Sequence, residues 1–388
     1  MEILPCHPDL LPLTLSFLPP QEGLQLSVVI PVRNEAEVLT RTLTALAEQV
    51  DASGNPLEPV CYEVLVLVNN CTDETAEVAR CFARRVPLFA LHVAETTLPA
   101  ELAHVGSARR LLMDAACRRL LQCGRPQGMI ASTDGDTRVA PDWVYQTLRQ
   151  ASHGADAIGG RIRVERHRSE DREARLFYLR DLAYQRGLAR LESCLDPDPF
   201  DPWPRHHQFY GGSLAITASA YCRVGGLPVL PCLEDIALGE ALRRMDARIR
   251  HSPAVRVSTS ARQDGRTQMG LSSQLREWGD MGRSGHSHWV QQPAAVEARM
   301  RARHELRCRQ HLSADEIDVL ADELAVPCSL LHDGSTMPFG MLWAEVMACH
   351  MEPYGAWARR WPLIEITQAL HELREQGRDF TKIENAPS

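Results

Sequence analysis

The chain has 388 residues, of which 44% are hydrophobic and 24% are charged, and its formal net charge is -8. This length favours one large domain with a smaller second unit, and the composition is that of a folded globular protein rather than a disordered or membrane-spanning one. The negative charge argues against a nucleic acid as the main partner, although local clusters of arginine could still bind phosphate groups.

Lysine is almost absent from the chain. Lys382, near the carboxyl terminus, is the only lysine. A Walker A lysine, a Schiff-base lysine and the strand lysine of protein kinases are thereby excluded. Any phosphate group must be held by arginine, by backbone amides or by a metal ion.

The cysteines and the amino terminus indicate the cellular compartment. Twelve cysteines contain no C-x-x-C pair, and Cys61, Cys117 and Cys222 lie in apolar stretches, which favours reduced thiols over disulfides or a zinc site. The amino terminus has no basic n-region, and the longest apolar runs, residues 26–32 and 64–68, are only strand-sized. We therefore expect a soluble, cytoplasmic protein without a transmembrane segment.

Between residues 26 and 164, short β-branched runs alternate with amphipathic segments, as in an α/β domain with a mainly parallel sheet. The predicted strands are residues 27–32, 63–68, 88–93, 129–133 and 157–164. Apolar residues at helical spacing predict helices over residues 35–49 and 73–83. Ligands bind at the carboxyl ends of the strands in such sheets, so the turns that follow the strands are the expected functional positions.

A leucine stripe predicts a long helix over residues 169–195. The Pro-rich, aromatic stretch of residues 196–204 follows and is predicted to be a loop. This loop is either a rigid spacer or a flap over the acceptor, in which Trp203 would stack on a sugar.

Helical character dominates the rest of the chain. Beyond residue 266 the β character vanishes, and the run from Ser313 to Glu316 forms a capping box at the start of a helix. The predicted organisation is an N-terminal extension (1–25), an α/β domain (26–270) and a mostly helical C-terminal region (271–388).

The strongest local signal is Asp134-Gly135-Asp136, which directly follows the strand predicted at residues 129–133. Two carboxylates one residue apart at a strand end can bind one hard cation together with diphosphate oxygens, and Gly135 would leave space for the ligand. The implied cation is Mg²⁺ or Mn²⁺. Alternatively, both aspartates only cap the backbone amides of a turn.

Polar turns also follow other predicted strands, and they occur in a recognisable order. In sequence order, the motifs are the turns VIPVRNE (29–35), VNNCTDET (68–75) and DGD (134–136), the helix starts GSAR (106–109) and LEDIAL (233–238), and the strand segment GGS (211–213). The set resembles the motifs of family 2 glycosyltransferases over residues 26–266, and an ordered set is far more specific than any single motif. The resemblance implies the GT-A fold of nucleotide-diphospho-sugar transferases, with a mainly parallel central sheet flanked by helices and, here, a C-terminal helical appendage.

The resemblance also implies roles for individual residues in binding a UDP- or GDP-sugar. Pro31, Arg33 and Glu35 would line the base and ribose, and Asp134 and Asp136 would hold the ribose and the metal ion. Glu35 could instead be an acid in the first turn of a helix, where the dipole favours it.

Further residues are expected on the nucleotide side. Arg109 would support the base or the diphosphate. The family usually has an aspartate in its second turn, whereas Asn69 and Asn70 stand here, and since an amide both donates and accepts, the choice between uracil and guanine stays open. Arg262 and Arg266 either reach the diphosphate bidentately or are solvated surface arginines.

Glu234 and Asp235 precede an apolar helical face that begins at Ile236. A carboxylate there can accept the proton of an attacking hydroxyl group, so Asp235 is the predicted catalytic base, with Glu234 beside it, and inversion at the anomeric carbon would follow. Both acids could instead only stabilise a helix start. If the enzyme retains configuration, as some relatives do, Asp235 would bind the acceptor.

The sequence therefore predicts a metal-dependent hexosyltransferase that moves a sugar to a hydroxyl group of a small molecule or a glycan. A nucleotidyltransferase of similar fold would be expected to carry a Gly-rich basic start and a lysine, and neither is present. A non-catalytic nucleotide-sugar-binding protein is the other alternative, against which the intact DGD and ED pairs argue. A processive synthase is not expected, because residues 274–278 only loosely resemble its Q-x-x-R-W signature.

A third metal ligand is expected after the last strand of the domain, where His251 is a weak candidate.

Overall fold

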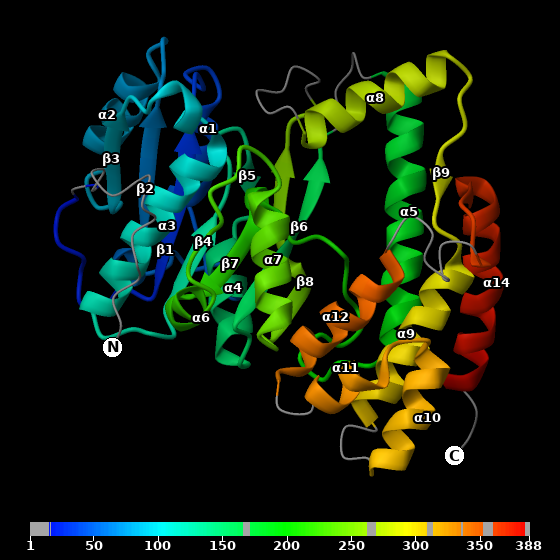
Figure 1. Ribbon diagram of the computed structural model, residues 1–388. Coiled ribbons are helices and arrows are strands. Elements are labelled where there is room, and N and C mark those ends of the chain that lie inside the picture. Colours follow the sequence, from blue (N-terminus) through cyan, green and yellow to red (C-terminus); the bar gives the residue numbers. More distant parts are fainter. Residues whose placement is uncertain are drawn as a thin grey trace. The chain divides into compact units, whose positions relative to one another are not determined.

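The computed structural model describes residues 15, 17–165, 171–261, 269–308, 313–334, 337–351 and 360–384. The chain divides into two compact units, each traced in Figure 1. The first, called here the sheet unit, comprises residues 1–168, 208–242 and 248–274. The second, called the helical unit, comprises residues 169–207, 243–247 and 275–388.

The sheet unit is built on one eight-stranded sheet with the order β3-β2-β1-β4-β7-β6-β8-β5. Its strands are β1 (Leu26–Val32), β2 (Tyr62–Asn69), β3 (Leu91–Thr96), β4 (Met129–Ser132), β5 (Arg138–Val139), β6 (Ala157–Val164), β7 (Leu214–Thr217) and β8 (Ile249–Thr259). The helices that accompany them are α1 (Leu39–Ala47), α2 (Thr75–Arg85), α3 (Val105–Gln122), α4 (Trp143–Ser152), α6 (Ala218–Arg223) and α7 (Glu234–Arg244).

The sheet is mixed, with a parallel half formed by the first four strands in its order. β1 pairs in parallel with β2 and β4, and β2 pairs in parallel with β3. β7 runs antiparallel to both β4 and β6, whereas β8 runs parallel to β6. The predicted α/β class with flanking helices is confirmed.

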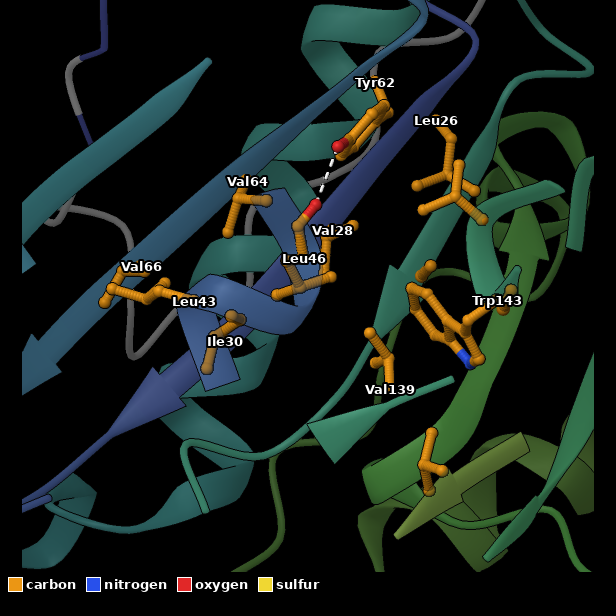
Figure 2. Close-up of a cluster of buried hydrophobic side chains, with 14 of the residues drawn as sticks. Leu26, Val28, Ile30, Leu43, Leu46, Tyr62, Val64, Val66, Val139 and Trp143 are labelled. Atoms are coloured by element: carbon orange, nitrogen blue, oxygen red, sulfur yellow. Dashed lines mark hydrogen bonds between the residues drawn. The ribbon is translucent and has the colours of Figure 1, made fainter. Parts of the chain in front are cut away.

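The core of the sheet unit explains why the central strands are continuous apolar runs. β1 is buried along almost its whole length, and alternate residues face opposite sides of the sheet. One face packs against α1, α2 and α4 in a single apolar cluster, part of which is shown in Figure 2. Within it, the hydroxyl group of Tyr62 donates to the carbonyl of Leu46 over 2.7 Å, so its burial leaves no polar atom unpaired. Helix α3 packs on β1, β2 and β4 with residues outside this cluster, such as Leu112, and so covers the other face.

Some predicted boundaries are corrected by the structure. β3 begins at Leu91 instead of residue 88, because Leu88 is 81% exposed and Phe89 closes a turn onto the carbonyl of Val86. The first helix begins only at Leu39, after a turn at residues 36–38. The short strands β5 and β7 and the long strand β8 complete the sheet in addition to the predicted ones.

The helical unit contains the long helix α5, which begins at Arg172 and is capped by Asp171, whose carboxylate accepts the backbone N–H groups of Glu173 and Ala174. Its elements are α5 (Arg172–Leu195), α8 (Leu271–Arg283), β9 (Trp289–Val290), α9 (Pro293–Cys308), α10 (Ala314–Leu324), α11 (Cys328–Asp333), α12 (Phe339–Met351), β10 (Ile364–Glu365) and α14 (Ile366–Glu384). Helices α5, α9 and α14 pack together around one apolar cluster, green, yellow and red in Figure 1.

Two predictions for this region have opposite outcomes. The capping box is present, because the backbone N–H of Ser313 donates to the carboxylate of Glu316 over 2.9 Å at the start of α10. The expected loss of all β character beyond residue 266 is wrong, since β9 and β10 form a two-stranded antiparallel sheet. Each of these strands has two residues, too short to produce a periodic pattern. None of the helices in the described parts of the chain has the length and apolar character needed to cross a bilayer.

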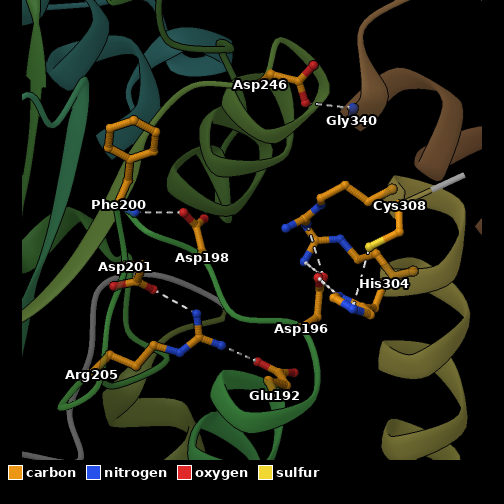
Figure 3. A network of polar contacts seen from close by, with 12 residues as sticks. Glu192, Asp196, Asp198, Phe200, Asp201, Arg205, Asp246, His304, Cys308 and Gly340 are labelled. Carbon is orange, nitrogen blue, oxygen red and sulfur yellow. Dashed lines mark hydrogen bonds and ion pairs between the residues drawn. The ribbon is translucent and has the colours of Figure 1, made fainter. Parts of the chain in front are cut away.

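The segment between α5 and β7 begins with an irregular stretch, as predicted for residues 196–204. Asp196, whose side chain is fully buried, accepts hydrogen bonds from Arg303 and Arg307 of α9, each over 3.0 Å. Arg205 joins Asp201 and Glu192 in a second ion-pair group, shown with Asp196 in Figure 3. These bonds fix both ends of the loop within the helical unit, and Trp203 lies beside the guanidinium of Arg190.

Candidate functional site

The candidate site lies at one edge of the sheet, where several strands end. β1, β2 and β4 are parallel, so the turns after Val32, Asn69 and Ser132 emerge at the same edge. β7 is antiparallel to β4, with Leu214 opposite Ser132, and therefore begins at that edge. Residues from the first and last parts of the sheet unit meet there.

The turn after β4 carries Asp134 and Asp136. The side chain of Asp134 is 41% exposed, and Asp136 is half-buried. The hydroxyl group of Thr42 donates to the carbonyl of Gly135 over 2.9 Å, which ties this turn to α1. A carboxylate thus held at the end of a strand, and still half in solvent, can bind a cation.

Gly135 is required for a reason other than the predicted one. A Cβ atom at this position would lie 2.8 Å from Cγ1 of Val32 and 3.2 Å from Cγ of Glu35. The glycine therefore makes room for the turn after β1, and the two turns pack directly on each other.

The turn after β1 contains Pro31, Arg33 and Glu35. Arg33 is exposed and donates from Nη1 to the carbonyl of Ala103 over 3.1 Å. Glu35 is 7% exposed, and its backbone N–H donates to Oγ1 of Thr75 over 2.8 Å. It precedes α1 by four residues, so it does not lie in the first turn of that helix.

Asn69, the last residue of β2, and Asn70, which follows it, differ in their hydrogen bonding. The side chain of Asn70 donates to the carbonyl of Leu98 over 2.9 Å and accepts the N–H of Leu98 over 3.0 Å. Asn69 is 4% exposed, and its Oδ1 has no hydrogen-bond partner within the described residues. The amide of Asn70 is thus occupied by the backbone, and the unpaired oxygen belongs to Asn69.

Arg109, on the first turn and a half of α3, is buried among protein oxygens. Its Nε donates to Oγ of Ser132 over 3.1 Å, and its Nη2 donates to Oδ1 of Asp134 over 2.7 Å. Its Nη1 is paired with Oε1 of Glu234. The side chains of Arg109 and Glu234 are each only 4% exposed.

Asp235 lies beside this ion-pair group in the first turn of α7, as predicted. Its Oδ2 accepts the backbone N–H of Gly211 over 2.7 Å, and its Oδ1 accepts that of Ile236 over 2.8 Å. The bond to Ile236 stabilises the start of the helix, and the bond to Gly211 attaches the helix to the turn before β7.

The sequence did not reveal which groups these residues contact. Ser132, Thr42 and Thr75 each hold part of the site, yet only Thr75 belongs to one of the quoted motifs. Their partners are between 23 and 93 residues away along the chain, and no local pattern encodes such pairs.

Some predicted site residues are not part of this arrangement. Arg262 and Arg266 lie outside the described residues. His251 is in β8, opposite Gly159 of β6. In the portions of the chain that the structure describes, no group of three or more His, Cys, Asp or Glu side chains is placed to hold a metal ion.

Comparison with known proteins gives one family match. Residues 27–204 match the model of the family described as Glycosyl transferase family 2. No curated protein sequence matches the chain.

Three solved structures are among those to which the chain is similar. The mannosyltransferase PcManGT from Pyrobaculum calidifontis, in complex with GDP-Man and Mn²⁺, is 17% identical with a TM-score of 0.44, over 84% of this chain and 74% of that one. TarS 1–349 of S. aureus with UDP-GlcNAc is 15% identical with a TM-score of 0.43, over 84% and 91%. Glucosyl-3-phosphoglycerate synthase of Mycobacterium tuberculosis, with Mn²⁺, UDP-Glc and phosphoglyceric acid, is 18% identical with a TM-score of 0.35, over 69% and 83%.

The family match confirms the resemblance drawn from the ordered turns. It contains the turns after β1, β2 and β4, including Asp134 and Asp136, and these turns meet at one edge of the sheet. Residues 27–204, slightly less than half of the chain, are thus similar to glycosyl transferase family 2.

Proposed function

We propose that this glycosyltransferase uses a UDP- or GDP-sugar and a divalent cation, Mg²⁺ or Mn²⁺, and transfers the sugar to a hydroxyl group of a small molecule or a glycan. The observation that carries the proposal is the position of Asp134. Its half-exposed carboxylate lies at the edge where β1, β2 and β4 end. Gly212, whose neighbour Gly211 binds Asp235, packs against it.

Asp134 and Asp136 would hold the cation. Ions of the Mg²⁺ type are commonly bound by one or two carboxylates, with substrate phosphates and water completing the octahedron, so this pair of acids suits such an ion without a third protein ligand. When bound, the cation would neutralise negative charge on the departing nucleoside diphosphate.

Residues of the neighbouring turns would bind the nucleotide. Pro31, Arg33 and Glu35 belong to the turn that packs on Gly135, which supports a role next to the acids. Asn70, with its amide held by Leu98, would shape the base site through its backbone, since both sides of its amide are already bonded. Arg262 and Arg266 remain proposed diphosphate ligands on sequence grounds.

Asp235 would act as the general base. The acceptor oxygen would attack the anomeric carbon as the bond from that carbon to the diphosphate breaks, the bonding electrons would leave with the nucleoside diphosphate, and Asp235 would take the hydroxyl proton. Attack opposite the leaving group inverts the anomeric configuration. Each Asp235 oxygen accepts one backbone N–H, which holds the carboxylate in place and leaves lone pairs for the proton.

The experiment is a panel of UDP- and GDP-sugars with Mn²⁺ or Mg²⁺, in which binding is followed by thermal shift and transfer by product analysis. Asp235→Asn should lower the transfer rate by roughly 10²- to 10⁴-fold while the donor still binds. Glu240→Gln is the matched control, because Glu240 is an exposed acid on the same helix.

Other outcomes would identify the alternatives. Release of pyrophosphate from a nucleoside triphosphate would indicate a nucleotidyltransferase instead. Donor binding without transfer to any acceptor or to water, unaffected by Asp235→Asn, would indicate a non-catalytic binding protein. Retention of the anomeric configuration in the product would assign Asp235 to acceptor binding.

A further inference from the structure

A single buried guanidinium connects the two halves of the proposed site. Arg109 donates to Asp134 from Nη2 and is paired with Glu234 through Nη1, while its Nε donates to Ser132 at the end of β4. Asp134 belongs to the turn proposed to hold the metal ion, and Glu234 immediately precedes the proposed base. The three partners are 23, 25 and 125 residues from Arg109 along the chain.

Two glycines close the packing around this guanidinium. A Cβ atom on Gly211 would lie 2.5 Å from Cζ of Arg109, so the backbone of the turn before β7 lies directly on the guanidinium. A Cβ atom on Gly212 would lie 2.9 Å from Oδ2 of Asp134. Little free space therefore surrounds the guanidinium on this side.

We infer that Arg109 is a positioning residue that couples the metal-binding turn to the acceptor-side helix α7, and that it is not a ligand of the nucleotide. This inference rests on the proposed function. A planar guanidinium can hold two carboxylates at once in a fixed geometry, which the single ammonium group of lysine cannot do. The side chain is 4% exposed, and each of its three nitrogen atoms donates to a protein oxygen.

The coupling has a defined direction. The carboxylate of Asp134 would interact with both Arg109 and the cation. Glu234 interacts with the same guanidinium through Nη1 and so competes with Asp134 for it. Neutralising Glu234 leaves Arg109 with one carboxylate partner, so Arg109 holds Asp134 more strongly and the local charge becomes more positive. Both effects weaken cation binding at Asp134, although Glu234 makes no contact with Asp134 itself.

The test measures nucleotide binding in the absence of an acceptor. Calorimetry with the full chain and UDP or GDP gives the Mn²⁺ concentration needed for half-maximal nucleotide binding. Glu234→Gln should raise this concentration by about fivefold or more, which is the range of ordinary coupling between sites. Thermal unfolding of each variant without ligands shows whether it is folded.

A double-variant cycle shows whether the effect passes through Arg109. In an Arg109→Lys background the connection is lost, so adding Glu234→Gln should change the Mn²⁺ requirement by less than about twofold. Arg110→Lys is the matched control, because Arg110 is equally buried on the same helix but binds Asp114 and the carbonyl of Leu227. In that background the effect of Glu234→Gln should persist in full.

The outcomes separate this inference from the proposed function. If the unaltered chain binds neither nucleotide in the presence of Mn²⁺, the proposed function fails and the coupling fails with it. If nucleotide binding is normal but Glu234→Gln has the same Mn²⁺ requirement, or its effect survives Arg109→Lys, only the coupling is overturned. Should Glu234→Gln not fold, Arg109→Lys alone must alter the Mn²⁺ requirement relative to Arg110→Lys, and equal values for these two variants would overturn the coupling.

Discussion

Gly211 donates its backbone N–H to Oδ2 of Asp235 over 2.7 Å, although 24 residues separate the two. The bond sets the direction of the carboxylate in the first turn of α7. Because Gly211 also lies on the guanidinium of Arg109, one backbone position determines the placement of both side chains.

Gly211→Ala should therefore lower the transfer rate by roughly 100-fold, because the new methyl group must displace either Arg109 or the bond to Asp235, and a misplacement of about 1 Å at a reacting group has this effect. Steady-state kinetics should show the loss in kcat and in the KM of the acceptor. Gly212→Ala is the companion variant, since its methyl group would approach the Asp134 carboxylate most closely and would reach Ile162 only at ordinary contact distance. It should act mainly on the Mn²⁺ requirement, and the same kinetic profile for both variants would contradict this assignment.

Asp134→Asn and Asp136→Asn should each reduce metal-dependent transfer by roughly 100-fold, because the cation loses a charged ligand and with it about 2.7 kcal/mol of transition-state stabilisation. Rates measured across a range of Mn²⁺ concentrations provide the test. Asp142→Asn serves as the control, since Asp142 is a nearby acid that pairs with Arg256. A normal Mn²⁺ profile in Asp136→Asn would exclude Asp136 as a ligand.

The stability of the sheet unit should depend on Glu63 at acid pH. Burial favours the neutral form of Glu63, but hydrogen bonds from Arg119, His92 and Ser27 outweigh burial and lower its pKa from 4.5 to about 2. The folded-state pKa is below the unfolded value, so this stabilisation is complete above about pH 4.5 and is lost as the pH falls towards 2.

Glu63→Gln should remove this pH dependence and destabilise the protein by about 3 kcal/mol or more at neutral pH, because it leaves the Arg119 charge buried without its carboxylate. Chemical unfolding at a series of pH values between 2 and 7 measures both effects. Glu48→Gln, at an exposed position after α1, should leave the profile unchanged. An identical pH profile for Glu63→Gln and the unaltered chain would show that Glu63 is not the group responsible.

Asp196→Ala should destabilise the helical unit by about 3–5 kcal/mol, because Arg303 and Arg307 would keep two charges facing a site that has lost its carboxylate. Limited proteolysis should then cut the chain at residues 196–204, and thermal unfolding should begin at a lower temperature. Asp198→Asn is the control, since Asp198 accepts the backbone N–H of Phe200, which an amide oxygen can also accept. Protection of the loop in Asp196→Ala would argue against this anchoring role.

The parallel half of the sheet could be predicted from the sequence because β1 and β2 are buried on both faces and read as uninterrupted apolar runs. In the other half, β6 was predicted, but β5, β7 and β8 were not. β8 contains Pro253 and several polar residues, and β7 and β5 have only four and two residues. These strands are stabilised by pairing with strands that are distant in the sequence, and the local sequence pattern does not indicate that pairing.

In the candidate site, too, some residues could be proposed from the local sequence, whereas their contacts with distant segments could not. Asp134, Asp136 and Asp235 could be proposed as site residues from the sequence because each lies in a turn directly after a strand or at the start of a helix. The burial of Arg109 and its pairing with Glu234 depend on segments 125 residues apart. The sequence suggested a nucleotide ligand at this position, whereas the structure surrounds the guanidinium with protein oxygens.

The 125 residues between Arg109 and Glu234 also affect the order in which the proposed site is completed during synthesis. The family match ends at residue 204, before Gly211 and Glu234. A nascent chain of that length already contains the acids after β4 and the guanidinium of α3, but it lacks Glu234, the buried partner of that guanidinium. Because Glu234 is made after the other members of this ion-pair group, we expect Arg109 to be fully paired only after α7 has been made.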